Sequence, residues 1–289
     1  MIVMVTGSSG QVGRSLQKIA DDYPTITFHF LDRASLDITD QDAVLEVADR
    51  LCPDYIVNCA AYTAVDKAEQ EPERAKLINS TAVQYLAKAA TEVGATLVHY
   101  SSDYVYHNDV RRPLTEQDHT EPKGVYAKTK LEGEHKVVAS GCKAIVIRTS
   151  WVYSEYGHNF VKTMLRLAKD RSELSVVSDQ IGCPTYATDI ARATVKMMQG
   201  YPYVTDHQVT VNYAGSGKIS WYDFAIEIFR QSGIDMAVTP ITSEDYPTPA
   251  ARPAWSVMDM RLPFEIFGIN PVPWQQSLAE CLSTLKSNS

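Results

Sequence analysis

Short apolar segments alternate with longer segments of helical spacing through the first 150 residues. The short ones end in small or polar clusters and are rich in β-branched or aromatic residues, as expected of strands buried on both faces of a parallel sheet. Predicted strands are residues 2–5, 26–31, 55–58, 96–100 and 144–147. Predicted helices are residues 11–21, 74–92 and 126–139, the second with an apolar stripe of Leu77, Ala82, Leu86, Ala89 and Ala90. This alternation predicts an α/β fold of the Rossmann type, with a doubly wound parallel sheet.

The pattern changes after Thr149, where strands and helices no longer alternate regularly. Helical spacing marks residues 159–169, 187–198, 221–231 and about 275–285, and strand-like segments are 175–177 and 209–212. Seven prolines between positions 240 and 273 indicate a loop-rich segment before the last helix. We therefore expect a dinucleotide-binding domain over residues 1–150, with returning segments from about 178–215. Residues 151–289 would form mainly a smaller, substrate-binding lobe.

The composition limits the kinds of partner that this protein is expected to bind. The 289 residues carry a formal net charge of −8, so a basic nucleic-acid-binding face is not expected. No apolar run approaches the ~18 residues of a membrane span, and no signal peptide is evident, which favours a cytoplasmic protein. The five cysteines show no paired spacing, against a zinc site or a disulfide framework.

A glycine-rich loop follows the first predicted strand and opens the first helix. Gly7, Gly10 and Gly13 have the spacing G-x-x-G-x-x-G, which is typical of short-chain dehydrogenases. Glycines let backbone N–H groups approach a pyrophosphate, and the helix N-terminus adds partial positive charge. The predicted contacts in this loop are Gly7, Ser9, Gly10, Gln11 and Val12.

The ends of the next two strands suggest the rest of a dinucleotide site. Asp32 and Arg33 lie where an adenosine ribose is expected: the acid suits a free 2′-hydroxyl and the guanidinium a 2′-phosphate. We expect NADPH as the cofactor, with NADH left open. Additional predicted cofactor contacts are Asp37, Ile38, Ala60, Ala61, Tyr62 and Asn79.

Tyr126 and Lys130 lie four residues apart on a predicted helix, and therefore on one face. Ketone reduction needs a proton on oxygen, and a phenol with an ordinary pKa of about 10 supplies it better if an ammonium lowers that pKa. Ser102 ends the fourth strand, at the sheet edge where ligands bind in doubly wound folds, and could donate to a carbonyl. These three residues are the predicted catalytic group.

The motifs together resemble the dTDP-4-dehydrorhamnose reductase family of extended short-chain reductases. The similarity runs along nearly the whole chain. Matching stretches are residues 6–13, 58–68, 101–106, 126–134, 148–153, 157–161 and 179–185, with Arg252, Pro253, Ser256 and Asp259.

This resemblance implies reduction of the C4 keto group of dTDP-4-dehydro-β-L-rhamnose to dTDP-β-L-rhamnose, with NADPH or NADH. It makes Tyr126 the proton donor, Lys130 its partner and Ser102 the carbonyl ligand. By the same resemblance, Thr63, Tyr104 and Trp151 would line the sugar pocket, and Arg252 would grip the diphosphate.

The chain departs from the family pattern at positions that concern dimer formation. Some family members dimerise around a divalent cation held by acidic residues. The matching positions here are Ser15, Thr188 and Arg192, none of them acidic. We therefore expect no metal, and a monomer or a homodimer held by other contacts.

Three other functions differ from a reductase in the residues or cofactor behaviour that they require. A sugar-nucleotide dehydratase needs an Asp-Glu pair after the Ser102 position, whereas this chain has Asp103 and Tyr104. An epimerase would use the same residues but retain NAD. A non-catalytic subunit, such as the regulatory subunit of methionine adenosyltransferase, would not need the intact set of Ser102, Tyr126 and Lys130.

Overall fold

The computed structural model describes residues 1–107 and 109–287, which are built around a six-stranded parallel sheet. Its strand order is β10-β5-β4-β3-β1-β2. The strands are β1 (Ile2–Thr6), β2 (Thr27–Leu31), β3 (Tyr55–Asn58), β4 (Thr96–Ser102), β5 (Ala144–Thr149) and β10 (Gln208–Asn212). All five pairings are parallel. The doubly wound sheet predicted from the sequence is confirmed.

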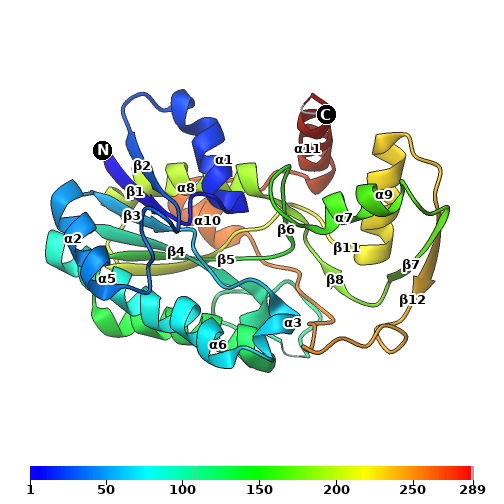
Figure 1. Cartoon of the computed structure of the whole chain (residues 1–289), viewed down its shortest axis with the longest axis horizontal. Coiled ribbons are helices and arrows are strands. Elements are labelled where there is room, and N and C mark those ends of the chain that lie inside the picture. Colours follow the sequence, from blue (N-terminus) through cyan, green and yellow to red (C-terminus); the bar gives the residue numbers. More distant parts are fainter. Residues whose placement is uncertain (108, 288–289) are drawn as a thin grey trace.

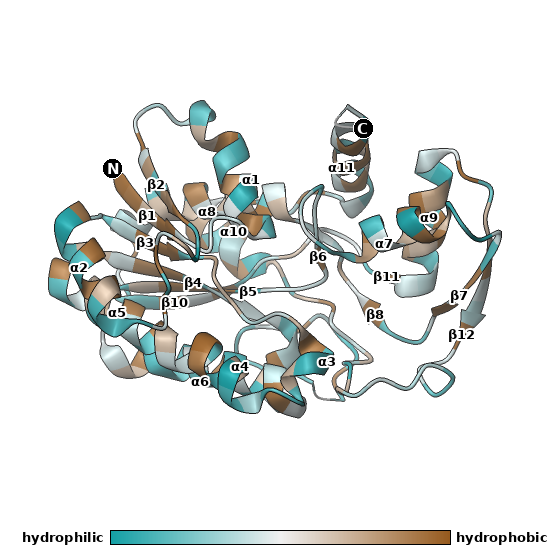
Figure 2. Ribbon diagram, in the orientation of Figure 1, coloured by the Kyte–Doolittle hydropathy of each residue, from teal (hydrophilic) through white to brown (hydrophobic). Residues whose placement is uncertain are grey.

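Helices cover both faces of this sheet (Figure 1). On one face lie α1 (Gln11–Ile19), α8 (Ala187–Gly200) and α10 (Arg261–Phe267). On the other lie α2 (Gln41–Leu51), α5 (Ala82–Val93) and α6 (Gly124–Ser140). Strand residues alternate between the two cores: Val3 and Val5 pack towards α1, and Met4 packs towards α2. Burial on both faces explains the continuous apolar strands, drawn brown in Figure 2.

A smaller body lies beside the carboxyl edge of the sheet, at the right of Figure 1. It contains α7 (Phe160–Leu167), α9 (Trp221–Ser232), β7 (Glu173–Val177), β12 (Ala237–Ile241) and the nearby α11 (Trp274–Ser287). Short strand pairs join it to the sheet: β6 (Val152–Tyr153) with β9 (Thr185–Tyr186), and β8 (Ile181–Gly182) with β11 (Ile219–Ser220). Its core is aromatic, with Phe224 edge-on to Trp274 at a centroid distance of 5.7 Å.

Some elements were not predicted. The apolar spacing of Val44, Val47 and Ala48 is a signal in the sequence for helix α2. Asp40 is its N-cap residue, and its side chain accepts a hydrogen bond from the Ala43 backbone N–H at 3.1 Å. The short helix α10 and the strand β12 were hidden by prolines, since Pro263 and Pro240 lie inside them.

The helix predicted over residues 74–92 is wrong in one respect. It is divided into α4 (Pro72–Lys76), a π-helical turn η2 (Leu77–Thr81) and α5. A π turn holds more residues than an α turn, so the residues before it are rotated away from the stripe of α5. Leu77 is therefore 40% exposed instead of lining the core, while Asn79 is buried.

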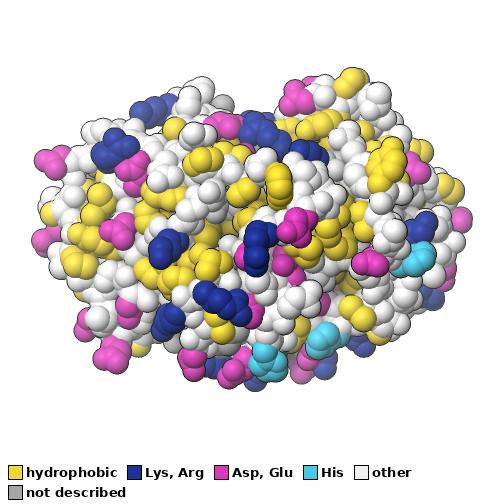
Figure 3. Space-filling view, turned by 180° about the vertical axis from the view of Figure 1, so that it is seen from behind, with side chains coloured by type: hydrophobic (Ala, Val, Ile, Leu, Met, Phe, Trp, Pro, Cys, Tyr) yellow, Lys and Arg dark blue, Asp and Glu magenta, His cyan; other side chains and the backbone are white. Residues whose placement is uncertain are grey.

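The surface carries charges of both signs. Lys and Arg side chains lie among Asp and Glu side chains on the face shown in Figure 3. None of the helices in the described part of the chain combines the length and apolar character that a membrane span requires.

Candidate active site

The glycine loop lies where the winding of the sheet reverses, between β1 and β3. Gly7 has a φ of +64°, and a Cβ there would overlap the backbone of Ala60, the second residue after β3. Ser9 and Gly10 are exposed, and Gly10 caps α1 without a side-chain hydrogen bond. The first N–H groups of α1 are thus open to an anionic ligand, as a phosphate loop requires.

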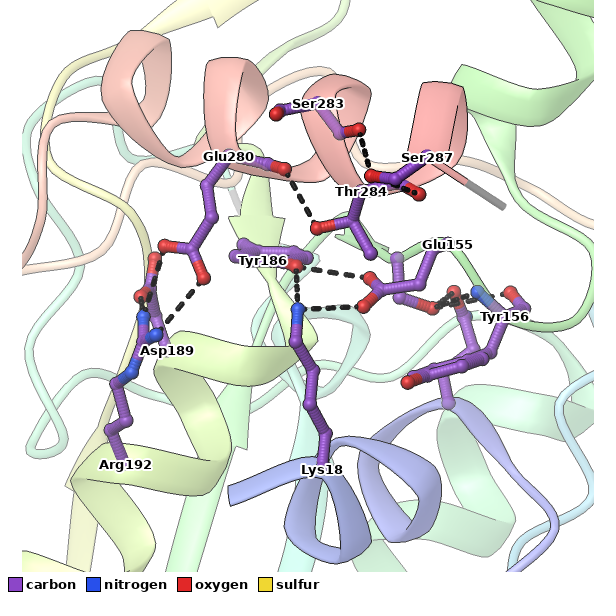
Figure 4. Close-up of polar contacts among 12 residues, drawn as sticks. Lys18, Glu155, Tyr156, Tyr186, Asp189, Arg192, Glu280, Ser283, Thr284 and Ser287 are labelled. Atoms are coloured by element: carbon purple, nitrogen blue, oxygen red, sulfur yellow. Dashed lines mark hydrogen bonds and ion pairs between the residues drawn. The ribbon is translucent and has the colours of Figure 1, made fainter. Parts of the chain in front are cut away.

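The same helix is tied to the substrate-side body. Gln11 Oε1 accepts hydrogen bonds from Ser154 Oγ at 2.8 Å and Asn159 Nδ2 at 2.9 Å. Further along α1, Lys18 Nζ donates to Glu155 Oε1 at 2.8 Å and Tyr186 Oη at 3.0 Å (Figure 4). The sequence gave no signal for these contacts, because the partners are more than 130 residues apart. They hold the phosphate loop against the segment that follows β6.

Asp32 and Arg33, the two residues predicted to lie at the adenosine ribose, are in different environments. Asp32 Oδ1 accepts hydrogen bonds from the Ser35 backbone N–H at 2.9 Å and the Ser35 hydroxyl at 2.7 Å, which lower the pKa of this carboxyl. The Arg33 side chain is 70% exposed and meets only the exposed Asp37, at 3.2 Å. Ile38 packs into the core beside α2. The guanidinium is therefore the freer of the two groups.

Small residues follow β3, as expected for a close-lying cofactor. Asn58 Oδ1 accepts a hydrogen bond from the Ala60 backbone N–H at 3.1 Å. Asn79 binds the Tyr62 backbone twice, at 2.8 Å to its N–H and 3.1 Å to its carbonyl oxygen, and also donates to Thr129 Oγ1 at 3.2 Å. Its amide is fully used within the protein. The π turn thus aims Asn79 at the segment that carries Ala60, Ala61 and Tyr62.

Gly133→Ala tests this packing. A Cβ at Gly133 of α6 would overlap the backbone carbonyl oxygen of Asn79 in the π turn. We expect the free energy of unfolding to fall by about 1–3 kcal/mol, the range for overpacking, as measured by urea denaturation. Lys128→Ala, an exposed change on the same helix, is the control. Equal stability of Gly133→Ala and the unchanged chain would contradict the close approach.

The three predicted catalytic residues meet at the carboxyl edge of the sheet. Tyr126 and Lys130 project from α6, and Ser102 ends β4. The Tyr126 phenol is hydrogen-bonded with the Ser102 hydroxyl. Lys130 is buried and its Nζ donates to the Tyr100 carbonyl oxygen at 2.6 Å.

The pKa values of this group differ from the sequence-based expectation. Burial raises the pKa of Tyr126 to about 12, although the Ser102 hydrogen bond opposes the shift. Burial also lowers the pKa of Lys130 to about 8. The prediction that Lys130 lowers the pKa of Tyr126 is therefore wrong for the chain by itself. The reason is that both groups are desolvated, and the ammonium is directed at a backbone carbonyl.

Aromatic side chains lie beside Tyr126. Tyr104 meets Tyr126 edge to face, with centroids 5.5 Å apart. Trp151 has a φ of +47°, rare for a bulky residue, and stacks on Trp221 at a centroid distance of 3.5 Å. The sequence analysis missed Trp221 because it lies 70 positions away. A side chain at Gly182 would overlap the Trp151 ring, so only glycine fits there.

The remaining predicted substrate residues lie on the adjoining loops. Thr63 is exposed after β3. Arg252 donates to Asp66 Oδ2 at 2.6 Å and to the Ala250 carbonyl oxygen at 3.0 Å. Asp66 lies in α3 (Val65–Ala68), so this ion pair joins the two sides of the site.

Comparison with known proteins agrees with this geometry. The family model described as the RmlD substrate binding domain matches residues 1–287. A dTDP-4-dehydrorhamnose reductase of Aggregatibacter actinomycetemcomitans is 42% identical over 283 residues, covering 96% of each chain. This chain belongs to the dTDP-4-dehydrorhamnose reductase family. The resemblance inferred from the motifs is confirmed.

Solved structures of other dTDP-4-dehydrorhamnose reductases have the same fold. The one from Clostridium acetobutylicum is 41% identical with a TM-score of 0.93, covering 99% of this chain and 100% of its own. The one from Bacillus anthracis, in complex with NADP, is 36% identical with a TM-score of 0.91, covering 98% and 99%. These reductases therefore share the arrangement of the whole chain, including both bodies.

The positions matched to the metal site of some reductases are occupied differently here. Ser15 and Thr188 are buried, on the helices α1 and α8 that pack together. Arg192 donates to Asp189 at 3.1 Å and to both carboxylate oxygens of Glu280 at 3.1 and 2.9 Å (Figure 4). Within residues 1–107 and 109–287, no group of three or more His, Cys, Asp or Glu side chains is placed to hold a metal. A metal-free contact between reductase subunits stays a prediction.

A buried ion pair behind the reductase site was also missed. Arg148 of β5 contacts the Glu134 carboxylate through Nε at 3.0 and 3.2 Å and through Nη2 at 2.6 Å. Both side chains are less than 10% exposed. The signal for it was an arginine at the end of an otherwise apolar strand. Because Glu134 follows Lys130 by one helical turn, the pair holds this part of α6 to the sheet.

Proposed function

We propose that this chain reduces the C4 keto group of dTDP-4-dehydro-β-L-rhamnose to give dTDP-β-L-rhamnose, with NADPH as the preferred cofactor and NADH as the alternative. The observation that carries the proposal is the meeting of Ser102, Tyr126 and Lys130 beside an open phosphate loop. A non-catalytic subunit has no need of this set. The identity of the sugar nucleotide rests on the family.

The residues divide the chemistry among them. When bound, the nicotinamide supplies the hydride for the carbonyl carbon. The Tyr126 phenol gives its proton to the carbonyl oxygen, and burial keeps this phenol protonated at neutral pH by raising its pKa to about 12. Ser102 positions the carbonyl by hydrogen bonding. Lys130 brings a cation towards the phenolate that remains, and its pKa of about 8 leaves it largely protonated.

The proposed ligand contacts follow from the places of the predicted residues. The cofactor contacts are Gly7, Ser9, Gly10, Gln11, Val12, Asp32, Arg33, Asp37, Ile38, Ala60, Ala61, Tyr62, Tyr126 and Lys130, with Asn79 acting through the Tyr62 backbone. The sugar nucleotide would contact Thr63, Ser102, Tyr104, Trp151 and Arg252. For Arg252 this requires exchange of Asp66 for a diphosphate oxygen.

We assign the preference for NADPH over NADH to Arg33. Asp32 Oδ1 is used by Ser35, whereas the Arg33 side chain is 70% exposed and could exchange its ion pair with Asp37 for a 2′-phosphate. We expect Arg33→Ser to raise the KM for NADPH roughly 10- to 100-fold, the value of a charge-assisted hydrogen bond, and to leave the KM for NADH unchanged. Arg50→Ser, an equal charge change at an exposed site on α2, is the control. An equal effect on both cofactors would contradict the assignment.

The function is tested by following NADPH absorbance with substrate made in place from dTDP-glucose by a dehydratase and an epimerase. Oxidation that needs both the epimerase and this protein supports the proposal. A purified chain that retains NAD and interconverts sugar epimers without net oxidation would indicate an epimerase instead. NADPH binding without turnover would indicate a regulatory subunit or another sugar.

The organisation of the enzyme is also proposed. Residues 1–150, with segments returning from about 178–215, would bind the cofactor, and 151–289 would mainly bind the sugar nucleotide. We further propose a cytoplasmic enzyme, where reduced nicotinamide is regenerated, acting as a monomer or a metal-free homodimer.

A further inference from the structure

Asp103 is a buried carboxyl group in direct contact with the Ser102 hydroxyl. It follows Ser102 at the start of η3 (Asp103–Val105) and is 3% exposed. Its Oδ1 atom accepts a hydrogen bond from Ser102 Oγ at 2.9 Å. The proposed mechanism assigns no role to this carboxyl, although Ser102 links it to Tyr126.

The direction of the hydrogen bonds through Ser102 depends on Asp103. A hydroxyl group has a single proton to donate. While Asp103 is ionised, Ser102 donates that proton to the carboxylate and accepts from the Tyr104 backbone N–H at 3.3 Å. The Ser102 proton that a substrate carbonyl needs is therefore directed away from it.

Protonation of Asp103 reverses this chain. A neutral carboxylic acid donates to Ser102 Oγ, which frees the Ser102 proton for the substrate carbonyl oxygen. Asp103 itself gains and loses no proton during the reduction: the proton on the product oxygen still comes from Tyr126.

We propose that Asp103 is a positioning residue whose neutral acid form turns the Ser102 proton towards the substrate carbonyl. The inference rests on the proposed function, since it assumes that a carbonyl oxygen lies between Ser102 and Tyr126. It goes beyond that function by making the protonation of a third side chain a condition of turnover.

The surroundings of Asp103 allow the neutral form. The titratable groups that face it are Tyr104, Tyr126 of α6 and Cys183 between β8 and β9. Beyond Tyr104, Arg252 is paired with Asp66. Burial raises the pKa of Asp103 to about 6, and the hydroxyls of Ser256 and Ser102 oppose that shift. Among the described residues, Asp103 Oδ2 has no hydrogen-bond partner. The acid is therefore poised to change its charge near neutral pH.

Asp103→Asn is the central test, because an asparagine amide donates to Ser102 at every pH. For the unchanged enzyme we expect kcat to fall as pH rises above the Asp103 pKa of about 6, approaching about tenfold per pH unit, before Lys130 with its pKa of about 8 loses its proton. Asp103→Asn should remove the decline below about pH 7.5 and leave only the loss above it. A decline below about pH 7.5 that persists in Asp103→Asn, or a variant that folds and binds NADPH but has lost turnover, would overturn the proposal.

Ser256→Ala supplies a second variant should Asp103→Asn fail to fold. Loss of the Ser256 hydroxyl removes a group that lowers the pKa of Asp103, so the decline in kcat should move to higher pH. An unmoved decline would count against the proposal. Asp21→Asn, at an exposed position of η1 (Ala20–Asp22), controls for the loss of one charge.

A measurement without turnover separates this inference from the proposed function. The infrared absorption of a protonated carboxylic acid, compared between the unchanged protein and Asp103→Asn, reports the titration of Asp103 directly. Titration near pH 6 supports the inference even if the sugar nucleotide is wrong. A carboxyl group that stays ionised throughout the pH range of activity overturns it, even where the reductase assay succeeds.

Discussion

Replacing Tyr126 by Phe is expected to lower kcat by about 10²-fold or more, the usual contribution of a general acid. Phenylalanine keeps the ring that packs edge-on against Tyr104 but has no proton for the carbonyl oxygen. Because the pKa of Tyr126 is raised to about 12, the unchanged enzyme carries this proton throughout the neutral range. The loss should appear equally in kcat and kcat/KM, which marks a group acting in the transition state.

The fold and the binding of NADPH should be unaffected by this substitution. Both are measured on the purified variant, by thermal unfolding and by titration with the cofactor. Tyr85→Phe, on α5 at the edge of a core away from the site, removes a tyrosine hydroxyl without touching the chemistry and should have full activity. Full activity in Tyr126→Phe would exclude Tyr126 as the proton donor.

The largest effect on stability is expected from Glu134→Ala, which should lower the free energy of unfolding by about 3–5 kcal/mol. Arg148 is buried against Glu134, with the Tyr106 hydroxyl oxygen 2.9 Å from its Nη1. Without the carboxylate, a guanidinium that cannot lose its charge is left desolvated and uncompensated. Urea denaturation of the variant and the unchanged chain gives the difference.

Two variants show whether the effect comes from the charge pair. Glu134→Gln keeps the shape and one acceptor oxygen, so it should be less damaging than Glu134→Ala. Glu132→Ala removes a less buried carboxylate from the same helix and should change stability by less than about 0.5 kcal/mol, as surface substitutions do. If Glu134→Ala and Glu132→Ala are alike, the ion pair does not stabilise the fold.

Much of the architecture was readable because its causes are local. The strands of a parallel sheet are apolar along their whole length, so five of the six were recognised within a few residues of their ends, and β10 within one. The glycine loop was readable since a strand, a tight turn and a helix follow one another directly. The spacing of Tyr126 and Lys130 needed only the periodicity of one helix.

The predictions from sequence failed where segments that are distant along the chain contact one another. Nothing near Leu77 indicates a π turn, because that turn is stabilised by the contacts of Asn79 with Tyr62 and Thr129. Trp151 could be placed in the site, but its stacking on Trp221 depends on how α9 is docked. Likewise, the pKa of Tyr126 could not be foreseen, since burial is decided by the packing of other elements.

The sequence by itself therefore determined the fold class, the glycine loop and the family, and it predicted which residues act in catalysis. Each of these depends on the order and spacing of residues within one or two adjoining elements. Only the tertiary structure decided that Lys130 binds the Tyr100 carbonyl, that Glu134 holds Arg148, and that Asp103 accepts a hydrogen bond from Ser102. The packing of strands and helices against one another determines which of these groups meet. Because burial removes water, each buried polar group then depends on a protein partner for its hydrogen bond.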